Sequence, residues 1–316
     1  QGCDITVEHD GDIYVIWRDF ELSSSKKNYG VTAVRSADGG ETFGKPVKVA
    51  NLPQYTPFDT ARDCGDGAEQ CPSEFVFSRV PLEPRVTADP TGGLDGIYVA
   101  VQQGDPATER PSNTSYNTTG APDRVSRGIV AIYRSVNNGQ TWQGPYTVTD
   151  ERRGHQFFPD VDALDGQLAV MWQDSREDPA YTIQRPVGNT AGATNSGDYV
   201  VNSYVAVSSN GTTFGPDALV SSVGNNPQYE MFASADVPFY GDYNWIDLVR
   251  TDAGLSGYTV WTDNRDVVTG PDPREATQDG FDVESGWELQ PDGTYTRLFN
   301  LGGYDQNIYG NSFTLP

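Results

Sequence analysis

The sequence predicts an all-β protein made of a repeated unit, and three observations carry this prediction. A turn sequence that begins with serine recurs at Ser36, Ser135 and Ser208. Each copy follows a run of β-branched and aromatic residues, a composition typical of strands. No segment has the periodicity of a convincing amphipathic helix. Because the copies are roughly 75 to 100 residues apart, we expect one closed, repetitive domain over residues 1–316.

The turn sequence at residues 36–43 has the chemistry of a tight hairpin. Asp38 can accept backbone N–H bonds inside the turn, and Gly40 supplies a positive φ at little steric cost. Thr42 favours the outgoing strand, and Phe43 gives the turn an apolar anchor. The equivalent residues are Asn137, Gly139, Thr141 and Trp142 in the second copy, and Asn210, Thr213 and Phe214 in a third, shorter copy. A degenerate fourth copy occupies residues 291–295.

This pattern, Ser-x-Asp-x-Gly-x-Thr followed by an aromatic residue, resembles the Asp box of sialidase-like β-propellers, also called the bacterial neuraminidase repeat. The resemblance covers nearly the whole chain and implies a propeller of four-stranded antiparallel blades. In that family the box joins the two outer strands of a blade, on the face away from the ligand site. Sialidase propellers have six blades, whereas four are clear here, so any site that needs the other two is in question.

The first repeat shows the internal order of a blade. A short strand at 5–7 and a turn at 10–12 precede an apolar run at 13–17, which we expect neighbouring blades to cover on both faces. Strands at 31–34 and 47–49 flank the first turn sequence. A polar insertion at about residues 51–80 follows, and it is too long to be a simple connection.

The next three repeats follow the same order. The expected strands are 84–88, 97–101 and 128–133 in the second repeat, 158–163 and 168–172 in the third, and 246–249, 258–261 and 282–288 in the fourth. Long loops rich in Gly, Pro, Thr and Asn occupy residues 103–127, 174–198 and 263–279. The tail at 303–309 either begins another blade or closes the ring against the first.

The charge balance excludes two classes of partner. The formal net charge is −23 and the isoelectric point is near 4.2. Nucleic acids and anionic membrane surfaces both require clusters of Lys and Arg, and no apolar run is long enough for membrane insertion. The acidity fits secretion, high salt or divalent cations, and does not decide among them.

Cysteine and asparagine positions favour an extracellular protein. Cys64 and Cys71 flank a loop that a local disulfide can close. The third cysteine, Cys3, is either buried and free, or separated from an upstream partner, or bonded to another subunit. The chain opens without an initiator Met or a visible signal peptide, as expected of a processed or truncated form. N-glycosylation sequons occur at Asn113, Asn117 and Asn210.

A second theme recurs where the second strand of a repeat ends. It reads Trp-Arg-Asp at 17–19 and Trp-x-Asp-x-Arg at 172–176 and 261–265, while the second repeat departs from it. In a propeller these strand ends share the face around the channel mouth. The candidates for a ligand-binding face are therefore Arg18, Asp19, Asp174 and Asp263. We favour the alternative that each Asp–Arg pair caps its strand, because a catalytic site is normally asymmetric.

The resemblance also implies a chemistry. Sialidases hold the sugar carboxylate with three arginines, whose guanidinium groups bind carboxylates in bidentate fashion. They use a Tyr nucleophile activated by Glu and an Asp acid/base, unlike glycosidases with two carboxylates. The family's first arginine lies in an Arg-Ile-Pro motif, which this chain lacks. If the protein is an enzyme, the candidate residues are Arg85, Arg176, Arg265, Tyr229, Glu230 and Asp160.

The sequence does not require a cofactor. Carboxylates at 10–12 and 162–165 have spacings that Ca²⁺ can use, but neither segment matches an EF-hand loop. Asp-Gly is also ordinary hairpin chemistry, which is the interpretation we favour. His9 and His155 are the only histidines and lie far apart in the sequence, so neither a zinc site nor a Ser-His-Asp triad is indicated.

Two functions of different class follow from these observations. The first is a non-catalytic extracellular scaffold whose long loops bind a carbohydrate or a protein, or assemble copies into an oligomer or filament. The second is an exo-acting glycosidase of the sialidase type. Three arginines that converge beside a Tyr–Glu pair favour the enzyme, whereas arginines that each pair with an Asp of their own blade favour the scaffold.

Overall fold

The computed structural model describes a set of residues that includes most of the repeated strands. These are residues 2–20, 29–52, 77–78, 83–111, 124–149, 151–178, 181, 183, 201–224, 231–232, 237–240, 244–263, 265, 287–289, 291, 295–297 and 307–315. This part of the chain is all-β, and it contains no helix of the length and apolarity needed to cross a membrane.

The first two sheets are four-stranded and antiparallel. The first sheet consists of β1 (Cys3–Val7), β2 (Ile13–Phe20), β3 (Tyr29–Ser36) and β4 (Val47–Asn51), in that order. The second consists of β6 (Arg85–Ala88), β7 (Ile97–Gly104), β10 (Gly128–Ser135) and β11 (Gln143–Thr147). Each sheet therefore contains one repeat of the sequence.

The third sheet repeats this four-stranded design, and the fourth has three described strands. The third consists of β12 (Gln156–Leu164), β13 (Gln167–Asp174), β14 (Asn202–Ser208) and β15 (Ala218–Leu219). The fourth consists of β18 (Trp245–Thr251), β19 (Gly254–Asp263) and β22 (Asn307–Thr314). For residues 307–309 the tail expectation was wrong, because they belong to β22, which pairs with β19 and not with the first sheet. The rest of the predicted tail, residues 303–306, lies outside the described residues.

Short pairings complete the described strands. They join β16 (Met231–Phe232) to β17 (Val237–Tyr240), β17 to β5 (Phe77–Ser78), β8 (Arg110–Pro111) to β9 (Arg124–Val125), and β20 (Trp287–Leu289) to β21 (Tyr295–Arg297). The strand expected at 282–288 therefore overlaps β20, which pairs outside the fourth sheet, and β22 takes the place expected for it.

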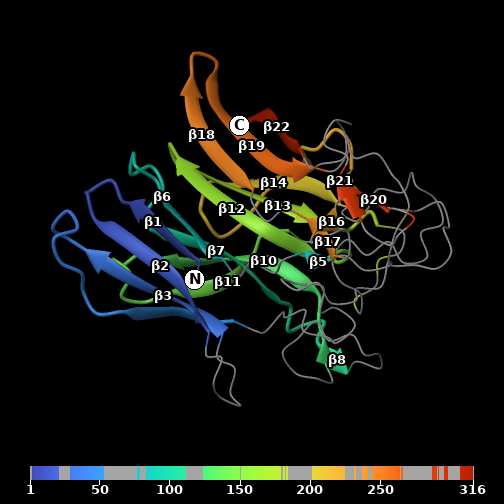
Figure 1. The fold of residues 1–316 in the computed structure, drawn as a ribbon. Helices are drawn as coiled ribbons and strands as arrows, with labels where there is room; N and C mark the ends of the chain where they lie inside the picture. Colours follow the sequence, from blue (N-terminus) through green and yellow to red (C-terminus); the bar gives the residue numbers. More distant parts are fainter. Residues whose placement is uncertain are drawn as a thin grey trace.

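The four sheets are blades of a β-propeller. Their first strands, β1, β6, β12 and β18, contact one another in chain order, so each sheet turns its first strand toward a common axis. Figure 1 shows the sheets following one another from the blue first blade to the orange last blade. This arrangement confirms the predicted all-β class with four-stranded antiparallel blades.

Apolar side chains fill each space between consecutive blades. Tyr14 and Ile16 of the first blade are fully buried against the second, because they project from the face of β2 that the second blade covers. The next two spaces are filled by clusters that include Ile132 with Leu168, and Met171 with Ile246. The continuous apolar strands predicted by the sequence are thus explained by burial on two faces.

The first strands of consecutive blades are also linked by hydrogen bonds. A first strand has an edge that faces the axis, and its outward N–H groups lack a ladder partner in its own sheet. Where the second blade follows the first and the fourth follows the third, side chains of the preceding blade accept these N–H groups. The bonds join Val86 N to Asp4 Oδ2 (2.8 Å), Ala88 N to Thr6 Oγ1 (3.1 Å), Ile246 N to Asp160 Oδ2 (2.8 Å) and Leu248 N to Asp162 Oδ2 (2.7 Å).

The serine-led turns share one hydrogen-bond pattern. In the first, Ser36 Oγ accepts from Gly40 N at 2.9 Å, and Asp38 Oδ1 accepts from Thr42 N at 2.9 Å. The other copies have the same pattern, at Ser135 with Gly139, Asn137 with Thr141, Ser208 with Gly211, and Asn210 with Thr213. The shared serine and Asp or Asn therefore each satisfy a backbone donor of the turn.

One expectation about the first blade was wrong. The run at 13–17 is not covered on both faces: Tyr14 and Ile16 are buried, whereas Ile13, Val15 and Trp17 are half-exposed. The reason is that the described chain places no blade against that outer face. Most of the insertion at 51–80, with Cys64 and Cys71, lies outside the described residues, as do Asn113 and Asn117 and the centre of the turn at 291–295.

Candidate functional site

The end of strand β13 forms a clamp around one aspartate. Trp172 and Asp174 lie two residues apart and so point to the same face of the strand. Trp172 Nε1 donates to Asp174 Oδ2 at 3.1 Å, while the backbone N–H of Arg176 donates to Oδ1 at 2.8 Å. The guanidinium of Arg176 returns to Oδ2 at 2.7 Å. Asp174 is fully buried, and all these donors compensate its lost hydration.

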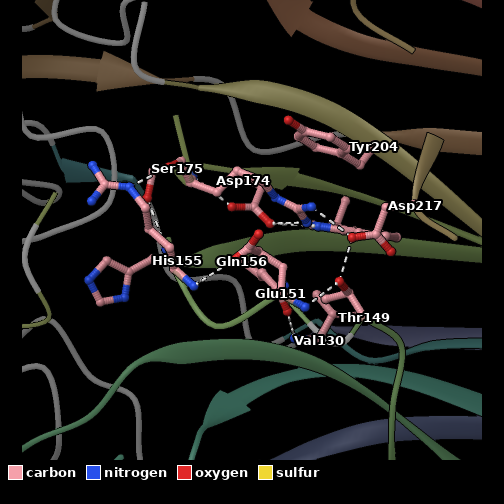
Figure 2. Close-up of polar contacts among 12 residues, drawn as sticks. Val130, Thr149, Glu151, His155, Gln156, Asp174, Ser175, Tyr204 and Asp217 are labelled. Carbon is pink, nitrogen blue, oxygen red and sulfur yellow. Dashed lines mark hydrogen bonds and ion pairs between the residues drawn. The ribbon is translucent and has the colours of Figure 1, made fainter. Parts of the chain in front are cut away.

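Arg176 has further partners in the outer part of the same blade. Its Nη1 lies 2.7 Å from Asp217 Oδ2, and its guanidinium lies 4.0 Å from the centre of the Tyr204 ring. Asp217 also accepts the hydroxyl of Thr149. Figure 2 shows Asp174, Tyr204, Asp217 and Thr149 gathered in this cluster. The guanidinium is therefore held between two carboxylates and an aromatic face.

The charged groups of this cluster shift one another's pKa values. Burial raises the pKa of Asp174, against the opposing effect of Arg176 and its hydrogen bonds. Burial alone would lower the pKa of Arg176, but Asp174 and Asp217 raise it overall. Tyr204 donates to Glu177 Oε1 at 2.8 Å, and burial together with this carboxylate raises the pKa of the phenol. Arg176 is accordingly a permanent cation paired within its own blade.

The fourth blade repeats the clamp. Trp261 Nε1 donates to Asp263 Oδ2 at 2.9 Å, and Arg265 donates its backbone N–H to Oδ1 at 2.8 Å and its Nη2 to Oδ2 at 2.6 Å. The guanidinium of Arg265 lies 3.9 Å from the centre of the Tyr309 ring, as that of Arg176 lies against Tyr204. Asp263 is fully buried. The two Trp-x-Asp-x-Arg sequences thus form the same structure.

The first blade uses a lysine in place of the arginine. Asp19 accepts from Lys48 Nζ at 2.5 Å, from the hydroxyl of Thr32 and from the Trp17 side chain. Burial would raise the pKa of Asp19, but these bonds lower it overall. Lys48 lies on β4, so no local motif indicated it. Arg18 lies on β2 beside this pair and is half-buried.

The second blade has a looser version of the pair. Arg127 is 1% exposed, and its Nε lies 3.8 Å from Asp105 Oδ2. Arg127 also donates to the carbonyl of Glu151 at 2.5 Å. Burial lowers the pKa of Arg127, and Asp105 opposes that shift. The second repeat lacks the motif in its sequence, yet Asp105 directly follows its second strand and lies near a cation, Arg127.

Arg85 and Asp160 lie apart from these clamps, on the first strands near the axis. Arg85 Nε is 3.8 Å from Asp160 Oδ1, and the guanidinium lies 5.5 Å from the centre of the Trp245 ring. Burial raises the pKa of Asp160 to about 7, although Ile246 N and Arg85 favour its charged form. Asp160 therefore combines a pairing role between blades with an acidity suited to proton transfer near neutral pH.

The three arginines proposed for a carboxylate site have different acidic partners. Arg85 pairs with Asp160, Arg176 with Asp174, and Arg265 with Asp263. Tyr229 and Glu230, the candidate nucleophile and its activator, lie outside the described residues. Each of the three arginines therefore pairs with a different aspartate.

His155 is a structural residue that the sequence did not explain. It is fully buried, and its Nδ1 accepts the backbone N–H of Gly128 at 3.1 Å. Next to it, Gln156 Oε1 accepts the N–H of Val130 at 3.0 Å. Figure 2 shows Gln156 reaching toward Val130. These two side chains therefore bind backbone N–H groups at the start of β10, before the residues of β10 that pair with β11.

An open groove lies beside Arg176, between the second and third blades. It has a volume of about 640 Å³ and is lined by residues of the second and third blades, among them Thr149, Glu151, Arg152, Arg176 and Asp217. Within this lining, Arg176 pairs with Asp217, and Glu151 accepts the backbone N–H groups of Arg152 and Arg153.

One group of carboxylates has spacing compatible with a metal. Glu8, Asp10 and Asp12 have carboxylate oxygens within 4.8 Å of one another. Their described contacts are those of a turn: Asp10 Oδ1 accepts from Asp12 N at 3.0 Å, Asp12 pairs with Arg35, and Glu8 accepts from Tyr14. Asp162, in the other acidic segment, binds Leu248 N of the next blade. These carboxylates have roles in the fold without an ion.

No protein-family model matches the chain, and neither does any curated protein. Among solved structures, the chain is similar to an α-L-arabinanase from Penicillium chrysogenum in complex with arabinobiose, with a TM-score of 0.40 and 13% identity over 82% of this chain and 56% of that one. An intramolecular trans-sialidase from Ruminococcus gnavus matches with a TM-score of 0.45 and 10% identity over 94% and 69%. This chain thus spans little more than half the length of the arabinanase.

Proposed function

We propose that the protein is a non-catalytic β-propeller scaffold that works outside the cell by assembling with other protein surfaces. The observation that carries this proposal is the pairing of Arg176 with Asp174 and of Arg265 with Asp263. Binding a sugar carboxylate requires a guanidinium fork that is free to accept it. Each of these forks already holds a buried carboxylate of its own blade.

The extracellular part of the proposal has separate support. The sequon at Asn210 lies in an exposed turn, where a glycan has room. The acidic surface, with a formal net charge of −23, is compatible with a secreted protein of high solubility. A carbohydrate ligand would then bind to the long loops of the face where the second strands end.

A second candidate is an exo-acting glycosidase of the sialidase type, and one observation favours it. The pKa of Asp160, raised to about 7 by burial, suits a general acid, and Arg85 lies beside it. Against this, Asp160 Oδ2 is occupied by the N–H of Ile246, a bond that links two blades. The carboxylate thus has a structural role that explains its position.

Hydrolysis of a fluorogenic sialoside and of a panel of other exo-glycosides between pH 4 and 8 tests the proposal. We expect no turnover above that of buffer. Turnover that disappears in Asp160→Asn and persists in Arg250→Ala would overturn the proposal and select the glycosidase. Arg250 is a suitable control, because its side chain is 71% exposed and pairs with Asp165, away from Asp160.

A further inference from the structure

The joint between the third and fourth blades contains one buried and one half-buried carboxyl group. Asp160 and Asp162 are alternate residues of β12, so they point to the same side of the strand. Asp160 Oδ2 accepts the backbone N–H of Ile246 at 2.8 Å, and Asp162 Oδ2 accepts that of Leu248 at 2.7 Å. Ile246 and Leu248 both lie on β18. This joint therefore depends on two acceptors that can gain or lose a proton.

The surroundings of Asp160 compensate a negative charge poorly. The residue is 7% exposed, so little water reaches it. Arg85 of β6 is the cation beside it, but its Nε is 3.8 Å from Oδ1, and its Nη2 also lies 3.9 Å from Glu83. Burial raises the pKa of Asp160 to about 7, against the effects of the Ile246 N–H and Arg85, and the nearby Asp4 adds to the rise. The closed joint therefore favours the protonated form of Asp160.

The second carboxyl group faces a like charge on the opposite blade. Burial raises the pKa of Asp162, against the backbone N–H that it accepts, and Asp247 of β18 adds to the rise. Its other hydrogen-bond donor is neutral, the hydroxyl of Thr87 at 3.3 Å. Arg250, the cation of β18, pairs with Asp165 instead. An ionised Asp162 is therefore repelled by Asp247 across the joint.

The joint between the first and second blades has the same geometry with different chemistry. Asp4 Oδ2 accepts the N–H of Val86 at 2.8 Å, and Thr6 Oγ1 accepts that of Ala88 at 3.1 Å. The hydroxyl of Thr6 is neutral, and Asp4 is half-exposed, so water reaches its carboxyl group. The molecule therefore contains a matched joint that has a hydroxyl and a hydrated carboxyl group in the two acceptor positions.

We propose that the joint between the third and fourth blades is a pH-sensitive clasp, which is closed while Asp160 and Asp162 are protonated and loosens when they ionise. A protonated carboxyl group still accepts the N–H of β18, and it has no charge that needs hydration. An ionised carboxyl group in the same place lacks hydration that one N–H and a distant guanidinium do not replace. Because opening the joint restores this hydration, ionisation favours the open form.

The loosening is local, because apolar packing also holds the joint. Met171 and Ala169, the residues of β13 opposite the two aspartates, are uncharged and buried. They belong to one cluster with Ile246, Leu248 and Trp261, and these contacts do not change with pH. The expected motion is a transient separation of β18 from β12 that exposes backbone N–H groups. This clasp goes beyond the proposed scaffold function and does not depend on it.

The pH window of the clasp follows from the same groups. In the closed joint the pKa of Asp160 is about 7, whereas that of a hydrated aspartate is about 4. Because the pKa is raised in the closed form, that form is favoured fully below about pH 4 and progressively less as the pH rises to about 7. For one group, the equilibrium constant for opening should rise about tenfold per pH unit within this window.

Amide hydrogen exchange of the full chain, read by NMR between about pH 4 and 9, tests the clasp. Protection factors, which correct for the intrinsic effect of pH on exchange, are compared for Ile246 and Leu248 and for Val86 and Ala88. We expect protection at Ile246 and Leu248 to fall between about pH 4 and 7 and then to level off. Protection at Val86 and Ala88 should change much less.

Three substitutions test whether the two carboxyl groups cause this behaviour. Asp160→Asn and Asp162→Asn keep an oxygen acceptor and cannot ionise, so each should reduce the pH dependence at the N–H that it binds. Asp252→Asn is the matched control, because Asp252 is exposed in the turn between β18 and β19, and its removal leaves both acceptors in place. Circular dichroism verifies the fold of each variant before exchange is compared.

A parallel fall in protection at all four N–H groups would overturn the proposal, because pH would then change the stability of the whole protein and not of this joint. Protection at Ile246 and Leu248 that does not vary with pH would also overturn it. So would a pH dependence that survives in both Asp160→Asn and Asp162→Asn. None of these outcomes bears on sialoside hydrolysis, so the proposed function is tested separately by its own assay.

Discussion

Asp174 holds Arg176 at two points, accepting its backbone N–H at Oδ1 (2.8 Å) and its guanidinium at Oδ2 (2.7 Å). Asp263 binds Arg265 in the same way. Lys48 on Asp19, and Arg127 near Asp105, place a cation against a carboxylate in the other two blades. A cation–carboxylate pair thus recurs in all four described blades, as expected of a feature that stabilises the blade.

Removing Arg176 should destabilise the fold strongly. Arg176→Ala leaves the buried Asp174 without its cation, and breaking one side of a buried pair costs about 3 kcal/mol or more. Urea unfolding of the full chain measures this loss. Arg250→Ala is the control, because its exposed pair with Asp165 should contribute less than about 1 kcal/mol. Equal losses in the two variants would contradict a structural role for the clamp.

Acid should weaken the first serine-led turn. The Thr42 hydroxyl and backbone N–H lower the pKa of Asp38 from 3.8 to about 2. A lowered folded-state pKa means that the stabilising effect is complete above about pH 4 and is lost as pH falls toward 2. An NMR titration should find the Asp38 carboxyl near pH 2, and Thr42→Val should raise that value. An unchanged pKa in Thr42→Val would show that the hydrogen bond is not its cause.

Asp160 should make the protein less stable as pH rises. Burial raises its folded-state pKa to about 7, so the folded state holds a proton that the unfolded state has lost. Stability should therefore fall between about pH 4 and 7, by on the order of a few kcal/mol for this group. Asp160→Asn should flatten the decline without abolishing it, because burial also raises the pKa values of Asp162 and Asp174. Urea midpoints across this range measure the slope.

The third turn offers a matched pair of variants. Asn210 Oδ1 accepts the backbone N–H groups of Thr212 and Thr213, at 2.9 and 2.8 Å. Asn210→Asp keeps both acceptors and should be nearly neutral, whereas Asn210→Ala loses them and should cost about 1 kcal/mol. Thermal melts of the two variants give the comparison. A loss in Asn210→Asp as large as in Asn210→Ala would mean that the side-chain oxygen is not what stabilises the turn.

The sequence predicted the local features of this fold well. Runs such as 97–101 and 168–172 became buried second strands because their apolar residues are continuous. The pairing of the strand-end aspartates was also predictable, because Trp172, Asp174 and Arg176 lie close together in the sequence and contact one another directly.

Contacts between residues far apart in the sequence could not be predicted from a local sequence pattern. Asp4 binds Val86 N, 82 residues away, and no local signal assigns an acidic residue to a partner in another blade. The same holds for Lys48 on Asp19 and for the exposure of Ile5, which depends on the absence of a described blade beside it. The partner of residues 307–309 was mispredicted for the same reason, because β22 pairs with β19, a strand that ends more than 40 residues earlier in the sequence.

Calorimetric titration of the protein with N-acetylneuraminic acid tests the central claim most directly. If Arg176 and Arg265 are committed to Asp174 and Asp263, the protein has no free arginine fork at these positions, and we predict no saturable binding up to millimolar sugar. Saturable binding that disappears in Arg176→Ala and Arg265→Ala but persists in Arg250→Ala would contradict the account. It would show that these arginines exchange their aspartates for a ligand carboxylate.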